Sequence, residues 1–392
     1  MKITRIETIP LVFPYSEPLY DAQFKAGHRQ TLIVRIHTDS GLIGIGESGS
    51  FGGPLETTKC VIDKELAPRL YGEDPLRTEW LWKKMYQMSL QHGRGGMIAC
   101  AIGGIDIALW DIKAQAAGLP LYELLGGYRN KVKAYASGGF YTRSKDTAGI
   151  VREMKDYVEQ GYRAVKMKVG RNRTPLNPLE VMPDPDFNYS VTEDLERVAA
   201  VVDAVGQEAE ILVDANAAWD LHTALTFGRK LDQLGVTAFE EPINADDLEG
   251  NAILARKLDL KIIGYETEFS LYRFRELIQR RCVDIIQADL TWAGGITEGR
   301  RIAALAYAFN MEMMPHCFSS GITLMATLHF LGGTPNGAML EMDRNPNGLR
   351  DGIVKDPLQI DTDGFVSLPR TPGLGIQLND ETVEQYMVGN NG

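Results

Sequence analysis

The sequence predicts an α/β fold in which a parallel barrel of eight strands carries an α+β capping domain. The chain has 392 residues, too many for one ordinary hydrophobic core, so a large and a smaller domain are expected. From about Lys131 onward, eight short β-rich runs alternate with amphipathic helical stretches, a pattern that implies a closed parallel barrel. We place the capping domain at residues 1–130, completed by residues 360–392, and the barrel at residues 131–359.

The first part of the capping domain has the pattern of an antiparallel sheet. Two apolar runs within residues 31–48 are joined by Asp-Ser-Gly at residues 39–41, which is a hairpin signal. After Pro54 the apolar residues recur with a helical period. Residues 97–118 are apolar on nearly all sides, and they predict a buried helix that a glycine ends.

The predicted barrel strands are short runs rich in apolar and β-branched residues. They cover residues 132–137, 163–169, 210–216, 236–242, 261–266, 283–289, 311–316 and 338–343. Helices are expected between them, for example at residues 191–206, 219–234 and 295–309. A doubly wound open sheet is the alternative, but it usually has fewer strands and a glycine-rich first turn. After Glu341 the alternation stops, so we expect no last helix. Residues 171–190 are too long for a routine βα loop.

Composition and charge exclude several classes of function. The net charge is −11 and no run of basic residues exists, so neither nucleic acid nor an anionic membrane surface is an expected partner. No stretch of 18 apolar residues predicts a membrane span, and the start lacks the apolar region of a signal peptide. The four cysteines form no CxxC pair, which predicts reduced thiols, a cytoplasmic location and no zinc site. They are Cys60, Cys100, Cys282 and Cys317.

Six ionisable residues stand at the expected carboxyl ends of successive strands. They are Asp214, Glu240, Glu266, Asp289, His316 and Glu341, separated by 26, 26, 23, 27 and 25 residues. One βα unit has about this length, because a barrel of about 250 residues holds eight units. The six side chains should therefore surround one mouth of the barrel, where active sites of such barrels lie. Packed carboxylates repel one another unless a cation neutralises them, and oxygen ligands favour Mg²⁺ or Mn²⁺ over zinc.

Lys166 and Lys168 lie in the apolar run at residues 163–169. Because strand side chains alternate, both lysines share one face, which would be the barrel interior near the cation. A divalent cation and low-dielectric surroundings should lower the pKa of a lysine and suit it to act as a base. His316 has Asp289 as its expected orienting partner. Taken singly, these features also fit a solvated edge strand, a helix N-cap and a structural histidine; together they favour one active site.

The ordered motifs resemble those of the enolase superfamily and, within it, the mandelate racemase subgroup. They are KMK, VDAN, FEEP, GYE, QAD followed by GGI, PH and LEMD. The resemblance implies a modified TIM barrel, (β/α)7β, with a capping domain formed by both termini. The Mg²⁺ ligands that it implies are Asp214, Glu240 and Glu266. It also implies that Lys168 is the base on one face of the substrate and that His316, paired with Asp289, works on the other.

The same resemblance assigns further roles around a shared first step. Lys166 would contact the substrate carboxylate, Asn216 would contact polar groups of the substrate, and Glu341 would hydrogen-bond the developing enolate. In this family a carboxylate substrate loses its α-proton to give an enediolate. The expected partner is therefore a small-molecule carboxylate, and the chain is expected to form a homo-oligomer.

Loops of the capping domain at residues 16–29 and 48–54 are expected to set specificity. The polar side chains there that we expect to contact substrate are Tyr20, Lys25, His28 and Arg29. Burying such groups unpaired beside a phenyl ring would cost about 1–3 kcal/mol each, so several hydroxyl groups suit them better. The sequence thus favours dehydration of a sugar acid, an aldonate or aldarate, to a 2-keto-3-deoxy acid.

Other reactions use the same proton abstraction and stay open. They are those of a sugar-acid lactone cycloisomerase and of a racemase or epimerase of a 2-hydroxy or amino acid derivative. Two further classes are a glycoside hydrolase on the same barrel and a metal-binding barrel without catalysis. Three departures from the family pattern bear on the substrate: the insertion at residues 171–190, the additional acid Glu268 beyond Glu266, and the bulky Trp292.

Overall fold

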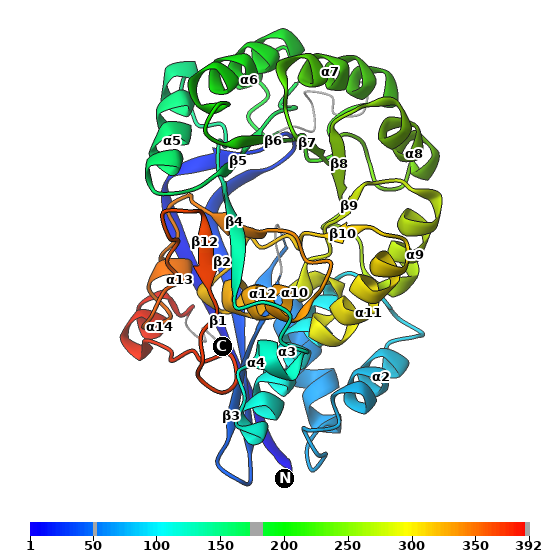
Figure 1. Ribbon diagram of the computed structural model, residues 1–392. Coiled ribbons are helices and arrows are strands. Elements are labelled where there is room, and N and C mark those ends of the chain that lie inside the picture. The colour runs from blue at the N-terminus through cyan, green and yellow to red at the C-terminus, as the bar shows by residue number, and fades with distance from the viewer. Residues whose placement is uncertain (50–52, 173–182, 389–392) are drawn as a thin grey trace.

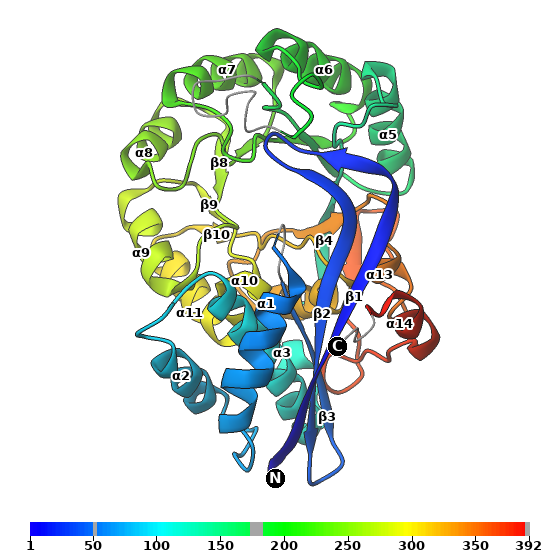
Figure 2. The same ribbon diagram turned by 180° about the vertical axis from the view of Figure 1, so that it is seen from behind.

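Three antiparallel strands open the computed structural model, which describes residues 1–49, 53–172 and 183–388. They are β1 (Ile3–Tyr20), β2 (Lys25–Thr38) and β3 (Ile43–Ser48), and they lie in this order in the sheet. The long β1–β2 hairpin reaches from the cap across one end of the barrel (Figures 1 and 2). Near its tip, Tyr20 and Tyr141 exchange two backbone hydrogen bonds of 2.9 Å, which fix the hairpin to the barrel.

The helices of the cap follow the sheet. They are α1 (Leu55–Cys60), α2 (Thr78–Met88), α3 (Met97–Ala117) and α4 (Leu121–Leu124), with π and 3₁₀ turns over 61–69 after α1. Helix α3 lies between β3 and the barrel helices α10 and α11, whose bounds are given below. A Cβ on Gly46 would lie 2.1 Å from the carbonyl oxygen of Gly104, and a Cβ on Gly103 would lie 2.7 Å from that of Thr291. This close approach on both sides confirms the predicted buried helix.

Eight parallel strands form the barrel in chain order. They are β4 (Lys131–Ser137), β5 (Ala164–Lys168), β6 (Glu210–Asp214), β7 (Ala238–Glu240), β8 (Lys261–Gly264), β9 (Ile285–Ile286), β10 (Glu312–Met313) and β11 (Leu340–Asp343). Strands β4 to β10 are neighbours in sequence order, and β11 pairs with β4. Met313 of β10 bridges Gly337, which lies just before β11, so the circle closes. The predicted closed barrel is confirmed, and an open doubly wound sheet is excluded.

The interior of the barrel has an apolar lower layer and a charged upper layer. The lower layer consists of Tyr135, Ala164, Leu212, Ala238, Ile263, Ile285 and Met314. Lys166 and Lys168 follow Ala164 on the same face of β5, whereas Val165 and Met167 belong to the cluster packed against the helices. Strand alternation therefore places both ammonium groups inside the barrel.

Helices cover the outside of the barrel (Figure 1). They are α5 (Thr147–Glu159), α6 (Val191–Val205), α7 (Leu221–Leu234), α8 (Leu248–Lys257), α9 (Ser270–Arg280), α11 (Gly295–Ala308) and α12 (Gly321–Gly333), with the short α10 (Leu290–Ala293) before α11. Helix α6 begins at a capping box made by Ser190 and Glu193. The Asp220 side chain caps α7, and Gly235, with φ of 77°, ends it.

After β11 the chain returns toward its beginning. It forms α13 (Gly348–Asp351), β12 (Phe365–Ser367) and α14 (Asp380–Tyr386). Strand β12 pairs antiparallel with β4, and Met387 bridges Leu11 of β1. The boundaries that we placed at residues 130 and 360 stay predictions. None of the described helices is long and apolar enough to cross a membrane, and the cytoplasmic location stays a prediction.

A buried carboxylate joins the cap to the barrel. Glu47 of β3 is fully buried, and it accepts hydrogen bonds from the Thr31 hydroxyl of β2 and from Ser319. It also accepts hydrogen bonds from the backbone N–H groups of Ser320, at 3.1 Å, and Thr323, at 2.8 Å, and from both hydroxyl groups. The first turn of α12 is therefore capped by a residue from the cap, since a carboxylate is stabilised at a helix N-terminus.

Candidate active site

The six residues predicted at strand ends gather at the carboxyl end of the barrel. Asp214 and Glu240 end β6 and β7, Glu341 lies in β11, Glu266 and His316 follow β8 and β10, and Asp289 is the N-cap of α10. None of these six residues is more than 6% exposed. The sequence spacing thus identified one shared and buried site.

Lys166 is the centre of the charged layer. Its Nζ donates to both carboxylate oxygens of Glu240, at 2.6 and 2.8 Å. The same atom lies 2.8 Å from Oε1 of Glu341 and 3.8 Å from Oδ2 of Asp214. The other carboxylate oxygen of Glu341 accepts the backbone N–H of Cys317 at 3.0 Å. Lys166 thereby links three strands that are separate in sequence.

Lys168 donates to Oδ2 of Asp214 and is 6% exposed. The sequence predicts that the pKa of a lysine beside a divalent cation is lowered; with only the protein's own groups around them, the pKa of Lys168 and of Lys166 is raised. Burial acts to lower both pKa values, but nearby carboxylates outweigh it. The carboxylate of Asp214 raises the pKa of Lys168, and those of Glu240 and Glu341 raise the pKa of Lys166. As placed here, both lysines are therefore ammonium ions held by acids.

His316 and Asp289 form the predicted pair. Nδ1 of His316 lies 2.7 Å from Oδ2 of Asp289, whose other oxygen accepts the backbone N–H of Thr291 at 2.6 Å. Nε2 of His316 is 3.7 Å from Glu266. Burial acts to lower the pKa of His316, but the carboxylates of Glu266, Glu341 and Asp289 raise it to about 9. The imidazole is therefore oriented by Asp289 and suited to carry a proton.

The carboxylate cluster is short of positive charge despite the two lysines. Burial and the neighbouring Asp214 raise the pKa of Glu240 well above its usual value. Oε2 of Glu266 is buried without a hydrogen-bond partner in the described residues. Within this part of the chain, no three His, Cys, Asp or Glu side chains are arranged to hold a metal ion, since Lys166 and Lys168 bind Glu240 and Asp214. The donor set and the unpartnered oxygen nevertheless fit a hard cation.

The residues expected to contact substrate from the cap are mostly engaged with acids. The hydroxyl of Tyr20 and Nζ of Lys25 both donate to Asp184, Lys25 at 3.0 Å. Arg29 is buried, pairs with Asp343 at 2.7 Å and stacks over the Phe318 ring at 3.6 Å.

The two remaining predicted contacts differ in exposure. His28 is exposed and lies 3.3 Å from Oε1 of Gln30. Asn216 follows β6 with φ of 42°, and its Oδ1 is buried without a hydrogen-bond partner in the described residues. Of the predicted substrate contacts, Asn216 thus presents an available acceptor beside the carboxylate cluster.

The three departures noted in the sequence have structural explanations. Glu268 is bound by Arg273 through hydrogen bonds of 2.9 and 2.7 Å, so its carboxylate does not join the cluster at Glu266. Trp292 lies beside His316, with ring centroids 5.5 Å apart and ring planes tilted by 42°. Of the 171–190 insertion, residues 173–182 lie outside the described residues. The rest packs on the hairpin tip through Asp184, which accepts from Tyr20, and through Arg171, which donates to the Asp21 carbonyl at 3.3 Å.

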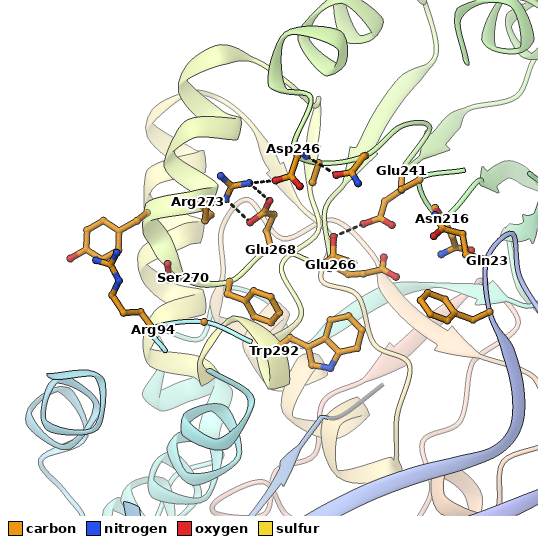
Figure 3. Close-up of a pocket in the computed structure, with 18 of the residues that line it drawn as sticks. Gln23, Arg94, Asn216, Glu241, Asp246, Glu266, Glu268, Ser270, Arg273 and Trp292 are labelled. Carbon is orange, nitrogen blue, oxygen red and sulfur yellow. Dashed lines mark hydrogen bonds and ion pairs between the residues drawn. The ribbon is translucent and has the colours of Figure 1, made fainter. Parts of the chain in front are cut away.

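A cavity of about 730 Å³ opens beside Glu266 at the mouth of the barrel (Figure 3). Its wall includes the polar side chains of Asp21, Gln23, Asn216, Glu241, Asp246, Glu268 and Arg273. A second cavity of about 340 Å³ is lined by Lys25, His28, Arg29 and Asp289. Both cavities are bounded by Phe24 and Trp292, so these two rings separate them. The site therefore has room for a substrate on two sides of the ring pair.

The comparison with known families shows which family the chain belongs to. Residues 149–382 match the family "Enolase C-terminal domain-like", and residues 7–126 match "Mandelate racemase / muconate lactonizing enzyme, N-terminal domain". The chain belongs to the mandelate racemase / muconate lactonizing enzyme family of the enolase superfamily. The resemblance inferred from the motifs is thereby confirmed.

Relatives in the mandelate racemase/muconate lactonizing enzyme family agree with this assignment. Arabinonate dehydratase from Saccharolobus solfataricus is 38% identical over 91% of this chain and 90% of that protein. D-galactarolactone cycloisomerase from Agrobacterium fabrum is 31% identical over 98% of this chain and 99% of that protein. A solved racemase from Streptomyces coelicolor A3(2) with bound magnesium has a TM-score of 0.87 at 30% identity, covering 98% of this chain and 100% of that one. The prediction of a lyase or isomerase with a capped barrel is confirmed.

Two acids that line the cavity are not among the substrate contacts predicted from the sequence. Asp21 is 4% exposed at the hairpin tip, where its Oδ1 accepts the N–H groups of Gln23 and Phe24. Glu241 follows Glu240 directly, and its φ of 41° turns the chain so that this acid also lines the cavity. The second acid of the FEEP motif indicated that Glu241 could lie near the site. No feature of the sequence near Asp21 indicated that its side chain is buried.

Proposed function

We propose that this chain dehydrates a sugar acid to a 2-keto-3-deoxy acid with Mg²⁺ as cofactor. The observation that carries the proposal is the placement of Lys168 and of the His316–Asp289 pair around one buried carboxylate cluster. Lys168 comes from β5, and His316 follows β10, so different sides of the barrel mouth supply them. Two separated proton-transfer groups are what removal of an α-proton and loss of a β-hydroxyl require.

Asp214, Glu240 and Glu266 would hold the cation. Its oxygen preference matches these three carboxylates, and the unpartnered oxygen of Glu266 supports its presence there. When bound, Mg²⁺ would stabilise the charge of the enediolate and compete with Lys168 for Asp214. Mn²⁺ would suit the same ligands.

The side chains of this chain would divide the work as follows. Lys166 would hold the substrate carboxylate, and Lys168, once neutral, would accept the α-proton. The bond between the β-carbon and its hydroxyl oxygen would then break while Nε2 of His316 donates a proton to that oxygen, so water leaves. The resulting enol tautomerises to the 2-keto-3-deoxy acid. Asp289 would keep Nε2 directed at the substrate, and Glu341 would keep Lys166 in place, as its 2.8 Å contact supports.

Opening of a sugar-acid lactone is the second candidate function, favoured by the 31% identity to D-galactarolactone cycloisomerase. Lys168 would abstract the same proton, and the ring oxygen of the lactone would leave in place of a hydroxyl group. A library of aldonic and aldaric acids and their lactones, incubated with the Mg²⁺-loaded protein and assayed for 2-keto acid with semicarbazide, distinguishes the two. Acids should give keto acid under dehydration, and lactones alone should react under cycloisomerisation.

Controls connect this assay to the site. Lys168→Met should abolish both keto-acid formation and exchange of the α-proton with D₂O. Inversion of a substrate without keto acid, accompanied by α-proton exchange, would replace dehydration by a racemase or epimerase. Whether the active protein is a homo-oligomer stays a prediction, which light scattering tests.

A further inference from the structure

We propose that the 730 Å³ cavity selects aldonic acids, which carry one carboxylate, over aldaric acids, which carry a second carboxylate at the far end. This inference rests on the proposed function and narrows its substrate class. The far end of a substrate held by Lys166 would extend from the carboxylate cluster into this cavity, because Glu266 and Asn216 lie on both (Figure 3). The chemistry of the cavity wall therefore determines which terminal group is accepted.

The wall is rich in hydrogen-bond acceptors. Buried carboxylates are supplied by Asp21, Glu241 and Glu268, which are 4%, 2% and 7% exposed. Oδ1 of Asn216 adds a buried acceptor that has no hydrogen-bond partner in the described residues. Gln23 offers little in return, since its amide nitrogen already donates to the backbone oxygen of Asn216 at 2.6 Å. Acceptors of this kind are satisfied by groups that donate.

Of the two arginines in the wall, Arg273 is already neutralised by acids. Arg273 donates to Glu268 at 2.9 and 2.7 Å and to Asp246 at 3.2 Å (Figure 3). The other guanidinium group of this cavity, on Arg94, belongs to an exposed residue, where water screens its charge.

The neighbouring cavity offers no free cation in its described lysine and arginine side chains either. Lys25 is bound to Asp184 at 3.0 Å, and Arg29 is bound to Asp343 at 2.7 Å. Apart from the exposed Arg94, a second substrate carboxylate would therefore have to break an existing ion pair to find a lysine or arginine partner in either cavity.

The two substrate classes differ at one group only. The terminal CH₂OH of an aldonic acid both donates and accepts, so it can donate to Asn216 or to a wall carboxylate. The terminal carboxylate of an aldaric acid only accepts, and it would face like charges on the buried carboxylates of the wall. Like-charge contacts of this kind weaken binding by several orders of magnitude at most. We expect the aldonic acid to bind about 100-fold more tightly than the matching aldaric acid.

The test uses pairs of acids with the same configuration at every stereocentre. Galactonate is compared with galactarate, gluconate with glucarate, and arabinonate with the aldaric acid formed by oxidising its terminal carbon. Dissociation constants are measured by calorimetry on the full-length Mg²⁺-loaded protein, and keto acid is assayed in parallel. In the pair that contains the tightest ligand, the aldonic acid should bind about 100-fold more tightly. An aldaric acid that binds as well or better there, or no binding by any acid, overturns the inference.

A charge change in the wall supplies the second arm. Glu268→Gln removes one carboxylate and leaves Arg273 with its 3.2 Å contact to the exposed Asp246, so the preference should fall about tenfold. Glu249→Gln makes the same change on an exposed side chain of α8, 75% exposed, and should leave the preference unchanged. An equal change in both variants, or none in Glu268→Gln, contradicts the assigned wall. If Glu268→Gln does not fold, Asp246→Asn takes its place, since Asp246 is exposed and also binds Arg273.

The binding and product assays separate the two proposals. A preference for aldonic acids without keto acid retains the selection and overturns dehydration. Keto acid formed equally from both members of a pair retains dehydration and overturns the selection.

Discussion

His329 of α12 should make the stability of this protein depend on pH below neutrality. Its side chain is fully buried where the barrel meets α4 and the C-terminal segment. Nδ1 accepts the backbone N–H of Tyr122 at 3.1 Å, and Nε2 donates to the Leu374 carbonyl at 3.1 Å. A protonated imidazole has no acceptor and would lose the first of these bonds. Burial lowers the pKa of His329 from 6.5 to about 4, although the bond to Leu374 opposes the shift.

The sign and size of the effect follow from these two values. Above pH 6.5 the histidine is neutral in both the folded and the unfolded chain, so it adds no pH dependence. As the pH falls below 6.5, His329 binds a proton in the unfolded chain but stays neutral in the folded one. The free energy of unfolding therefore decreases until the pH falls below about 4. The total loss is about 3 kcal/mol at 1.36 kcal/mol per pKa unit, and about 2.5 kcal/mol of it is reached at about pH 4.5.

Urea unfolding of the wild type and of His329→Asn at several pH values tests this reasoning. The variant should be less stable near neutrality, because packing is lost, but the gap should narrow by about 2.5 kcal/mol toward pH 4.5. Phe330→Leu removes buried volume at the next position without removing a titrating group, so its curve should run parallel to that of the wild type. Parallel curves for His329→Asn and the wild type would refute the argument.

Three further predictions concern the site and its support. Chelation by EDTA, or Glu240→Gln, should abolish keto-acid formation while the circular dichroism spectrum is unchanged; full turnover after exhaustive chelation would contradict the proposed metal site. His316→Asn should keep α-proton exchange by Lys168, followed by NMR in D₂O, but lower the dehydration rate by about 10²–10⁴-fold. Gly46→Ala should lower the free energy of unfolding by about 3 kcal/mol in urea titrations, because its Cβ would meet the Gly104 carbonyl oxygen at 2.1 Å; unchanged stability would show that α3 can shift.

The barrel and its charged mouth were predictable because both depend on local periodicity. The spacing from Asp214 to Glu240 to Glu266 equals one βα unit, and a parallel barrel repeats that unit around its axis. Alternation along β5 likewise fixed Lys166 and Lys168 on the interior face. Neither inference needs knowledge of a contact between distant parts of the chain.

The electrostatic state of the site was not predictable in the same way. Lys25 and Arg29 look available in the sequence, but their partners Asp184 and Asp343 lie 159 and 314 residues away. Glu268 is a milder case, since Arg273 follows it five residues later. Pairings across the fold depend on the hairpin crossing the barrel, which no local pattern specifies.

Glu47 has a consequence for the design of hybrid enzymes. Because the cap supplies the carboxylate and the segment around Ser320 supplies its donors, neither half is electrostatically complete alone. Consider a hybrid in which only the first 130 residues are exchanged for those of a relative. The buried N–H and O–H groups at the start of α12 would then have no hydrogen-bond acceptor unless the incoming cap also carries this acid. The natural module for exchanging specificity in this scaffold is therefore discontinuous: the hairpin domain together with the few residues, Ser319 to Thr323, that receive it.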